Sequence, residues 1–196
     1  MKNYFFTGIM LLLFFVGCKN QIKNENKSND NSKLAVASQS SGETNSDNKS
    51  IRLVAKPDTI AIDAAKTAVI VVDMQNDFGG KGGMFERAGI NISMIQKAIA
   101  PTAKVLVAAR QAGIKIIYLK MGYHNDLSDL GSEESPNRVR HLQFMHVGDT
   151  INAPDGSKSR ILIRNTWNTD IVSDLKPQQG DIIIDKTRFS GFYKLV

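Results

Sequence analysis

Two residues of this sequence, Asp73 and Lys186, have side chains and positions suited to shared chemistry. Asp73 closes an apolar run at 68–72, and Lys186 follows another that ends at Ile184. Reactive groups gather at the carboxyl ends of the strands of a parallel sheet, so these two side chains could share a site there. The carboxylate would act as a base, and the ammonium would favour a nearby thiolate. Strand-ending Asp and Lys residues are also common as exposed caps or salt bridges, so both interpretations stay open on these residues alone.

Three runs of apolar, mostly β-branched residues predict buried strands of a parallel sheet. The runs are 68–72, 114–119 and 181–184. Between the first two, apolar residues at helical spacing predict a helix with a capping box at 93–96 and a stop at Gly113. Pro101 either kinks this helix or marks its true first turn. The order strand, helix, strand predicts a doubly wound, Rossmann-like α/β fold, a mostly parallel sheet with helices on both faces.

The first 18 residues predict a signal peptide of the lipoprotein type. Lys2 precedes an apolar run at 5–16, which is too short to cross a bilayer as a permanent helix. The run ends in Phe-Val-Gly-Cys, which resembles the lipobox of bacterial lipoproteins and implies that Cys18 is lipidated. The alternatives are a plain signal peptide, or a buried apolar segment with an incidental cysteine.

Residues 19–50 are almost entirely polar and cannot bury enough surface to offset their ordering entropy. They predict a disordered tether between the signal at 1–18 and a folded domain at 51–196. A lipid on Cys18 would make the protein an exported lipoprotein, anchored to a membrane of the bacterial cell envelope, with the tether holding the domain off that membrane.

The composition excludes several other classes of function. The 196 residues suit one domain and a tail, and the net charge of +6 is spread along the chain without a basic stripe, so nothing argues for nucleic-acid binding. A single cysteine excludes an intramolecular disulfide and a multi-cysteine zinc site. His124, His141 and His146 fit no metal-binding pattern, so we expect neither a metal nor another cofactor.

Two motifs carry a family resemblance. Residues 71–78, Val-Val-Asp-Met-Gln-Asn-Asp-Phe, resemble the first-strand motif of the isochorismatase-like cysteine hydrolases, and residues 186–192, Lys-Thr-Arg-Phe-Ser-Gly-Phe, resemble their lysine segment. Three further segments resemble the ureidoacrylate amidohydrolase branch of that family: 134–137, Trp167 and 177–181. The resemblance extends from about Ala68 to Phe192.

The resemblance implies an Asp-Lys-Cys triad that hydrolyses a linear amide C–N bond of a small, ureidoacrylate-like substrate. Asp73 would take the thiol proton and Lys186 would hold the thiolate, while Asn137 and Trp167 are assigned to substrate binding. Fold alone does not select the amide substrate. The absence of an Asp-x-His pattern argues modestly against the nicotinamidase-like branch.

In the family, the nucleophilic cysteine follows the lysine segment, but no cysteine lies there in this sequence. We therefore expect a C-terminally truncated domain that is inactive as written and folds poorly as an isolated monomer, because a parallel sheet needs its later elements for cover. A complete domain could form a homo-oligomer. The alternative function is a lipid-anchored, non-catalytic binding protein that keeps the family pocket.

Overall fold

The computed structural model describes residues 50–193, which fall into two compact units divided after Asp63. The described part of the first unit is an antiparallel hairpin of β1 (Ser50–Leu53) and β2 (Ile60–Asp63). The predicted signal peptide and almost all of the predicted tether lie outside the described residues. Within 50–193, no helix is both long and apolar enough to cross a membrane.

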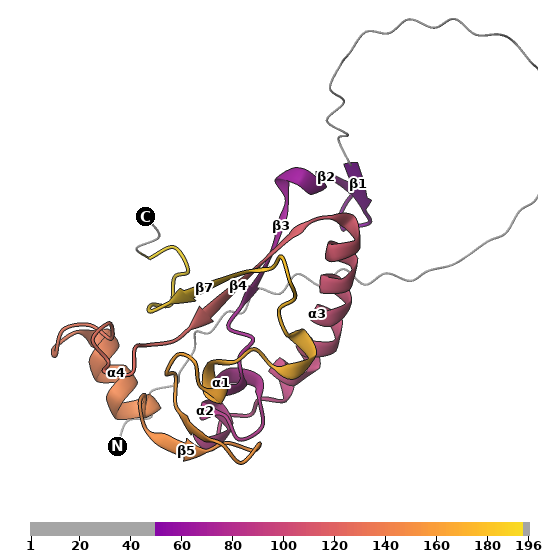
Figure 1. Cartoon of the computed structure of the whole chain (residues 1–196). Coiled ribbons are helices and arrows are strands. Elements are labelled where there is room, and N and C mark those ends of the chain that lie inside the picture. Colours follow the sequence, from indigo (N-terminus) through magenta and orange to yellow (C-terminus); the bar gives the residue numbers. More distant parts are fainter. Residues whose placement is uncertain (1–49, 194–196) are drawn as a thin grey trace, which may run out of the picture. The chain divides into compact units, whose positions relative to one another are not determined.

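The second unit is built on a parallel sheet of β3 (Ala68–Val72), β4 (Lys115–Met121) and β7 (Ile182–Lys186), in the order β3-β4-β7 (Figure 1). The three predicted runs are therefore confirmed as strands, and the α/β fold with a parallel sheet is confirmed with them. Four boundaries differ from the prediction: β4 and β7 each begin one residue later, at Lys115 and Ile182, and each ends two residues later. β4 continues to Met121 and β7 continues to Lys186, because hydrogen bonding to the neighbouring strand extends each strand beyond its apolar run.

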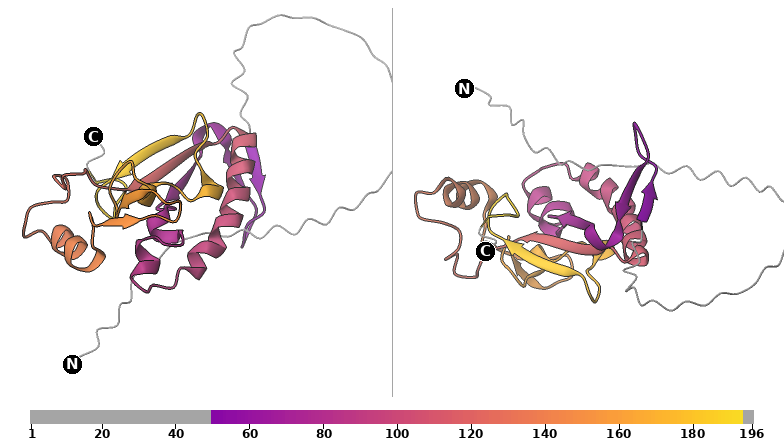
Figure 2. Two further views of the ribbon diagram at one scale, coloured as in Figure 1. Left: turned by 60° about the horizontal axis from the view of Figure 1, so that its bottom comes forward. Right: turned by 90° about the horizontal axis from the view of Figure 1, so that it is seen from above.

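Helix α3 (Ser93–Ala112) connects β3 to β4 and packs on one face of the sheet (Figures 1 and 2). Leu106 and Ala109 of α3 join Val71, Ile116 and Tyr118 of the sheet in one buried core. These residues recur at helical and strand spacing, so the sequence pattern alone produces this contact surface.

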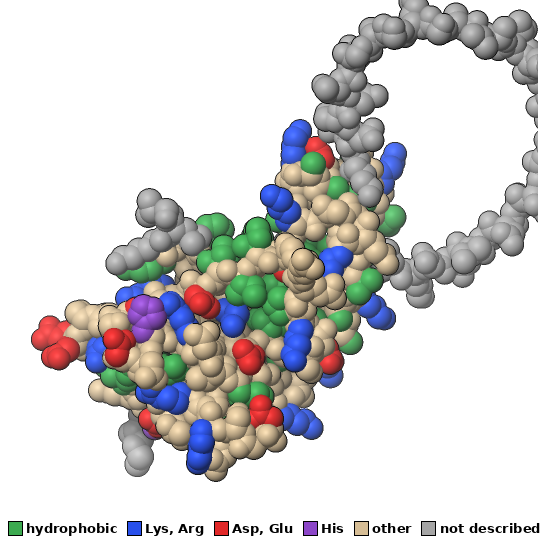
Figure 3. Space-filling model, in the orientation of Figure 1, with side chains coloured by type: hydrophobic (Ala, Val, Ile, Leu, Met, Phe, Trp, Pro, Cys, Tyr) green, Lys and Arg blue, Asp and Glu red, His purple; other side chains and the backbone are tan. Residues whose placement is uncertain are grey.

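The opposite face of the sheet carries a row of register partners, Ile70, Ile117 and Ile182. Ile70 is 48% exposed and Ile182 is 41% exposed, and Val72 on the same face is 39% exposed. In Figure 3, hydrophobic side chains gather on the viewer's side of the molecule around β7. This face is therefore incompletely covered within the described residues.

The N-terminus of α3 differs from the prediction. The predicted capping box at 93–96 is wrong: the Ser93 amide donates to Asn91 Oδ1 at 2.9 Å, and Gln96 donates instead to the carbonyl of Gly79. Pro101 lies inside the helix, which starts two turns earlier. The predicted stop is confirmed, since Gly113 adopts the left-handed conformation (φ 74°) that ends many helices.

Shorter elements complete the second unit. They are η1 (Ala64–Lys66), α1 (Asn76–Gly79), α2 (Met84–Arg87), α4 (Pro136–Met145), β5 (Thr150–Asn152), β6 (Lys158–Arg160), η2 (Trp167–Thr169) and η3 (Ser173–Leu175). A second core forms around Tyr123, Leu130 and Ile163, beyond the carboxyl end of β4. This core supports the loops that surround the strand ends.

Candidate active site

The fold brings Asp73 and Lys186 into direct contact. Asp73 immediately follows β3 and Lys186 is the last residue of β7, so both stand at the carboxyl edge of the sheet. β4 lies between these strands, and the two side chains therefore meet across its end rather than from neighbouring strands. Lys186 Nζ lies 3.0 Å from Asp73 Oδ2, close enough for both an ion pair and a hydrogen bond.

Lys186 has a buried side chain surrounded by acceptors. Besides Asp73, its ammonium donates to the carbonyl oxygens of Arg188 (3.3 Å) and Phe189 (3.4 Å) and approaches Met121 Sδ at 3.5 Å. A buried charge is costly unless it is paired and hydrogen-bonded. The turn after β7 meets this requirement by directing two of its carbonyl groups back at Nζ.

Asp73 combines an unusual backbone with a half-satisfied carboxylate. Its φ is +55°, in the left-handed region, which a residue other than glycine adopts at a cost. Oδ2 is paired with Lys186, but Oδ1 is buried and has no hydrogen-bond partner. Burial raises the pKa of Asp73, and the charge and hydrogen bond of Lys186, with a smaller contribution from the Met121 amide, oppose that rise.

This arrangement is suited to proton transfer next to a developing negative charge. Oδ1 has no hydrogen-bond partner within the described residues, so its lone pairs can take a proton from a group brought beside it. The ammonium on Oδ2 keeps a positive charge within reach of the anion that this transfer creates. Most buried polar atoms are hydrogen-bonded, so the unpartnered Oδ1 leaves an acceptor position open to such a group.

The residues that follow Asp73 fasten a distant segment to the strand end. Asn76 Nδ2 donates to the carbonyl of Trp167 at 2.8 Å. The buried Asp77 accepts from the amides of Met84 (3.0 Å) and Leu162 (2.7 Å), and from Asn168 Nδ2. Burial raises the pKa of Asp77 to about 6, against these hydrogen bonds, which lower it.

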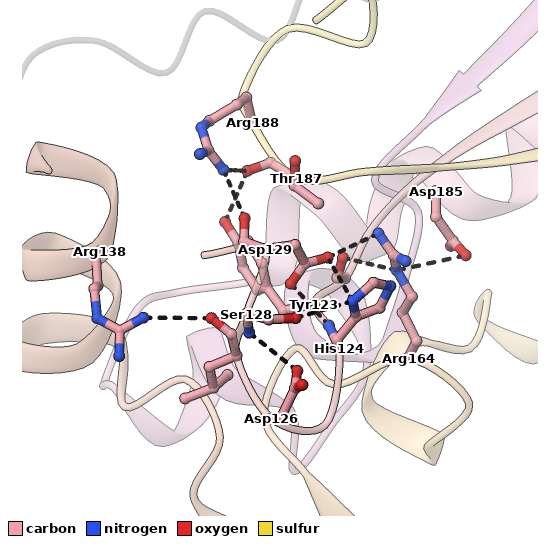
Figure 4. Close-up of polar contacts among 12 residues, drawn as sticks. Tyr123, His124, Asp126, Ser128, Asp129, Arg138, Arg164, Asp185, Thr187 and Arg188 are labelled. Atoms are coloured by element: carbon pink, nitrogen blue, oxygen red, sulfur yellow. Dashed lines mark hydrogen bonds and ion pairs between the residues drawn. The ribbon is translucent and has the colours of Figure 1, made fainter. Parts of the chain in front are cut away.

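A charged network holds the loop after β4 next to the site (Figure 4). Asp129 forms an ion pair with Arg164 at 3.1 Å, and Arg164 also lies 3.7 Å from Asp185 at the end of β7. Arg188 donates to the carbonyl of Asp129 at 3.1 Å and to that of Thr187. The loop is thus tied to the same turn that surrounds Lys186.

An aromatic group stands behind that turn. The ring of His141 lies 5.5 Å from that of Tyr123 and 5.9 Å from that of Phe189, measured between centroids. The Tyr123 hydroxyl donates to the carbonyl of Thr187 at 3.1 Å, and burial raises its pKa to about 12. Phe189 itself is 67% exposed, so it presents an apolar surface one residue beyond the Arg188 carbonyl.

The two predicted substrate-binding residues have other contacts. Asn137 donates to the carbonyl of Leu130 at 2.9 Å and to the Tyr123 hydroxyl at 3.3 Å, which secures the loop after β4. Trp167 lines a cavity of about 470 Å³ that neither Asp73 nor Lys186 lines. The structure therefore does not bring these two residues to the Asp73–Lys186 pair, and their role in substrate binding stays a prediction.

Several site residues escaped the sequence analysis. Phe189 and Arg188 lie in the lysine segment, so their closeness to Lys186 in the sequence could have indicated that they belong to the site. Asp129 and Arg164 belong to no motif and gave no signal. Among residues 50–193, no group of three or more His, Cys, Asp or Glu side chains is placed to hold a metal ion.

The geometry agrees with the family found by comparison. Residues 67–195 match the Isochorismatase domain, and the chain belongs to the isochorismatase family. A solved cysteine hydrolase from Pseudomonas syringae pv. phaseolicola 1448A is 32% identical and superposes with a TM-score of 0.50 over 68% of this chain and 52% of that one.

Two of the relatives are proteins named ureidoacrylate amidohydrolase RutB. The one from Rhizobium rhizogenes is 37% identical over 147 residues, which cover 74% of this chain and 57% of the relative. The one from Agrobacterium fabrum is 38% identical over 143 residues, covering 72% and 60%. The chain thus spans less than two thirds of the length of the relatives it matches.

Proposed function

We propose that this chain carries the acid–base half of a cysteine amidohydrolase that cleaves a linear amide or ureido C–N bond in a small molecule. The observation that carries this proposal is the Asp73–Lys186 contact, in which one carboxylate oxygen is paired and the other is buried and free. The names of the RutB relatives support the substrate class, and the similarity to a solved cysteine hydrolase supports a cysteine nucleophile.

In the proposed reaction, Asp73 Oδ1 takes the proton of a thiol, and the thiolate attacks the carbonyl carbon of the amide. Lys186 stabilises the negative charge as it develops. When the tetrahedral intermediate collapses, the C–N bond breaks and Asp73 returns the proton to the departing nitrogen, which leaves as ammonia or an amine. Water then hydrolyses the thioester and restores the thiol.

The thiol must come from outside the described residues. The sequence contains one cysteine, Cys18, in the predicted lipoprotein signal, and residues 50–193 contain none. Lipidation of Cys18 would remove its thiol from any chemistry. We therefore expect residues 1–196 alone to hydrolyse no amide, and expect activity only when a thiol is supplied beside Asp73.

The experiment supplies that thiol. The chain is fused to the part of the Agrobacterium fabrum relative that lies beyond the matched region, and ammonia release from ureidoacrylate is measured. The fusion should hydrolyse the substrate, and Asp73→Asn should lower kcat/KM by roughly a hundred- to ten-thousand-fold. Asp174→Asn, a change at an exposed carboxylate on η3, is the matched control and should leave the rate unchanged.

A folded fusion without hydrolysis would contradict the proposal and favour a non-catalytic binding protein. Asp73→Asn retaining most of the activity would contradict the role of Asp73.

We also propose that the protein is an exported lipoprotein attached through Cys18, with residues 19–50 as its tether. The charged start, apolar run and Gly17-Cys18 boundary support this. In bacterial cells fed a fatty-acid analogue, the wild-type chain should incorporate label and Cys18→Ala should not. Equal labelling of both chains would rule lipidation out.

A further inference from the structure

Met121, the last residue of β4, lies beyond the reach of the β3 backbone. The β3–β4 register ends at the pair Val72 and Leu119, and the Asp73 amide makes the final backbone bond, to the Leu119 carbonyl. At Asp73 the chain turns out of the sheet with a positive φ. The backbone groups of Met121 that face β3 therefore need partners from elsewhere.

The side chain of Gln75 provides these partners. Its Oε1 accepts from the Met121 amide at 2.7 Å, and its Nε2 donates to the Met121 carbonyl at 2.8 Å. The same Nε2 donates to the carbonyl of Thr169 at 3.1 Å, which uses both of its protons. Gln75 is completely buried, so these three bonds are made out of contact with water.

Met121 is in turn the residue that supports Lys186. The two are register partners in the β4–β7 ladder, and Met121 Sδ lies 3.5 Å from Lys186 Nζ. Gln75 also lies two positions after Asp73, at the far end of the turn that carries the carboxylate. One buried amide thus connects the strand end under the lysine with the turn that holds the aspartate.

We propose that Gln75 is a positioning residue that sets the distance between Asp73 and Lys186 by holding the end of β4 between them. The inference rests on the proposed function for its catalytic consequence, but its geometric part concerns this chain alone. Gln75 touches neither the substrate nor the reacting atoms. It acts through Met121, as a side-chain extension of the β3–β4 pairing.

The proposal requires an amide of this length. A methionine of similar size would fill the space but make none of the three bonds, and an asparagine would be too short to bridge both groups of Met121. Loss of the bridge should let the end of β4 and Lys186 move away from Asp73. The carboxylate would then lose part of the stabilisation that the ammonium gives to its charged form.

The test follows the titration of Asp73 in the full chain by carbon-13 NMR of the side-chain carboxyl, with the signal assigned by its loss in Asp73→Asn. Gln75→Met and Gln75→Asn should each raise the Asp73 pKa by about one unit, a tenfold change in its protonation equilibrium. Asn76→Leu is the matched control, because this neighbouring amide bonds the Trp167 carbonyl and not Met121. It should leave the titration unchanged.

A second measurement uses the fusion described above. Gln75→Met should lower kcat at least tenfold with a change in KM below twofold, since substrate contacts are untouched. If the wild-type fusion is inactive but the titration shifts as expected, the proposed function fails and the role of Gln75 stands. The proposal is overturned if Gln75→Met and Gln75→Asn titrate like wild type, if Asn76→Leu shifts equally, or if neither glutamine variant keeps the wild-type circular dichroism.

Discussion

At the scale of single residues, the motif at 73–77 contains one residue suited to proton transfer and three that bond to distant segments of the chain. Asp73 keeps one buried oxygen free. The three polar residues after Met74 instead bond to partners 46 to 94 positions away in the sequence. Asp77 also accepts from the amide of Met84, seven positions away. Losing one of these bonds would leave a polar group buried without a partner, which lowers the free energy of unfolding. The motif therefore consists of one reactive carboxylate, one amide that holds the end of β4, and two side chains, those of Asn76 and Asp77, that attach distant segments.

Asp77 gives a pH prediction. Its pKa is raised to about 6 in the folded chain, so the folded state binds a proton more tightly than the unfolded state between about pH 4 and pH 6. Its contribution to stability is therefore largest at low pH and is lost as the pH rises through 6. The unfolding free energy of wild type minus that of Asp77→Asn should fall by up to about 3 kcal/mol across this window and stay level above pH 7.

The measurement is urea unfolding of both chains at low protein concentration, from pH 4 to pH 8. Taking the difference between the two chains removes the other titrating groups they share. A difference that rises with pH, or does not change, would show that the three hydrogen bonds to Asp77 outweigh its burial.

At the scale of elements, the N-terminus of helix α3 has a side-chain hydrogen bond, but from a residue other than the one the sequence pattern indicates. The exposed Asn91 accepts a hydrogen bond from the Ser93 amide at the start of the helix, where Ile92 occupies the cap position, although Ser93 is the residue that matches the capping-box pattern. The bond that the pattern assigns to the serine hydroxyl, from the Gln96 amide, goes instead to the carbonyl of Ile92 at 2.9 Å. The helix still begins at Ser93, within the segment that the pattern marked.

Asn91→Ala should therefore destabilise the chain by about 1 kcal/mol, the usual cost of losing a side-chain acceptor for a free amide at a helix N-terminus. Ser93→Ala should change stability by no more than a few tenths of a kcal/mol, because alanine is a good helix former and the serine hydroxyl caps nothing. Unfolding midpoints in urea compare the two. A larger loss of stability in Ser93→Ala than in Asn91→Ala would contradict this expectation and support the predicted capping box.

At the scale of the whole molecule, the face of the sheet opposite α3 exposes apolar side chains on two of its strands. Ile70, Val72 and Ile182 stay 39 to 48% exposed on the face opposite α3. Contiguous apolar surface of this kind promotes association. We therefore expect the chain to associate at micromolar concentration and to bind a dye for exposed apolar surface.

The double variant Ile70→Thr, Ile182→Thr should at least halve the dye signal and shift sedimentation toward monomer. Its matched control is Val105→Thr, Val107→Thr, which changes two β-branched residues of α3 that are 51 and 52% exposed. That control should leave both readings near wild type. A soluble wild-type monomer with one cooperative thermal transition and no dye binding would contradict the expectation.

The sequence by itself determined the three strands, the long helix with its stop at Gly113, the family and the two residues of the candidate pair. These features depend on periodicity over a few neighbouring residues, or on motifs that lie at strand ends, and both can be read along the chain. The sequence did not predict that β4 lies between the strands that carry Asp73 and Lys186.

Only the tertiary structure decided which oxygen of Asp73 is free, that Gln75 pairs with Met121, and that Trp167 faces a separate cavity. It also decided that Asp129 and Arg164 hold the loop after β4. The physical reason is the same in each case. A buried polar group must find a partner wherever packing places one, and a partner 35 to 113 positions away leaves no mark on the local pattern.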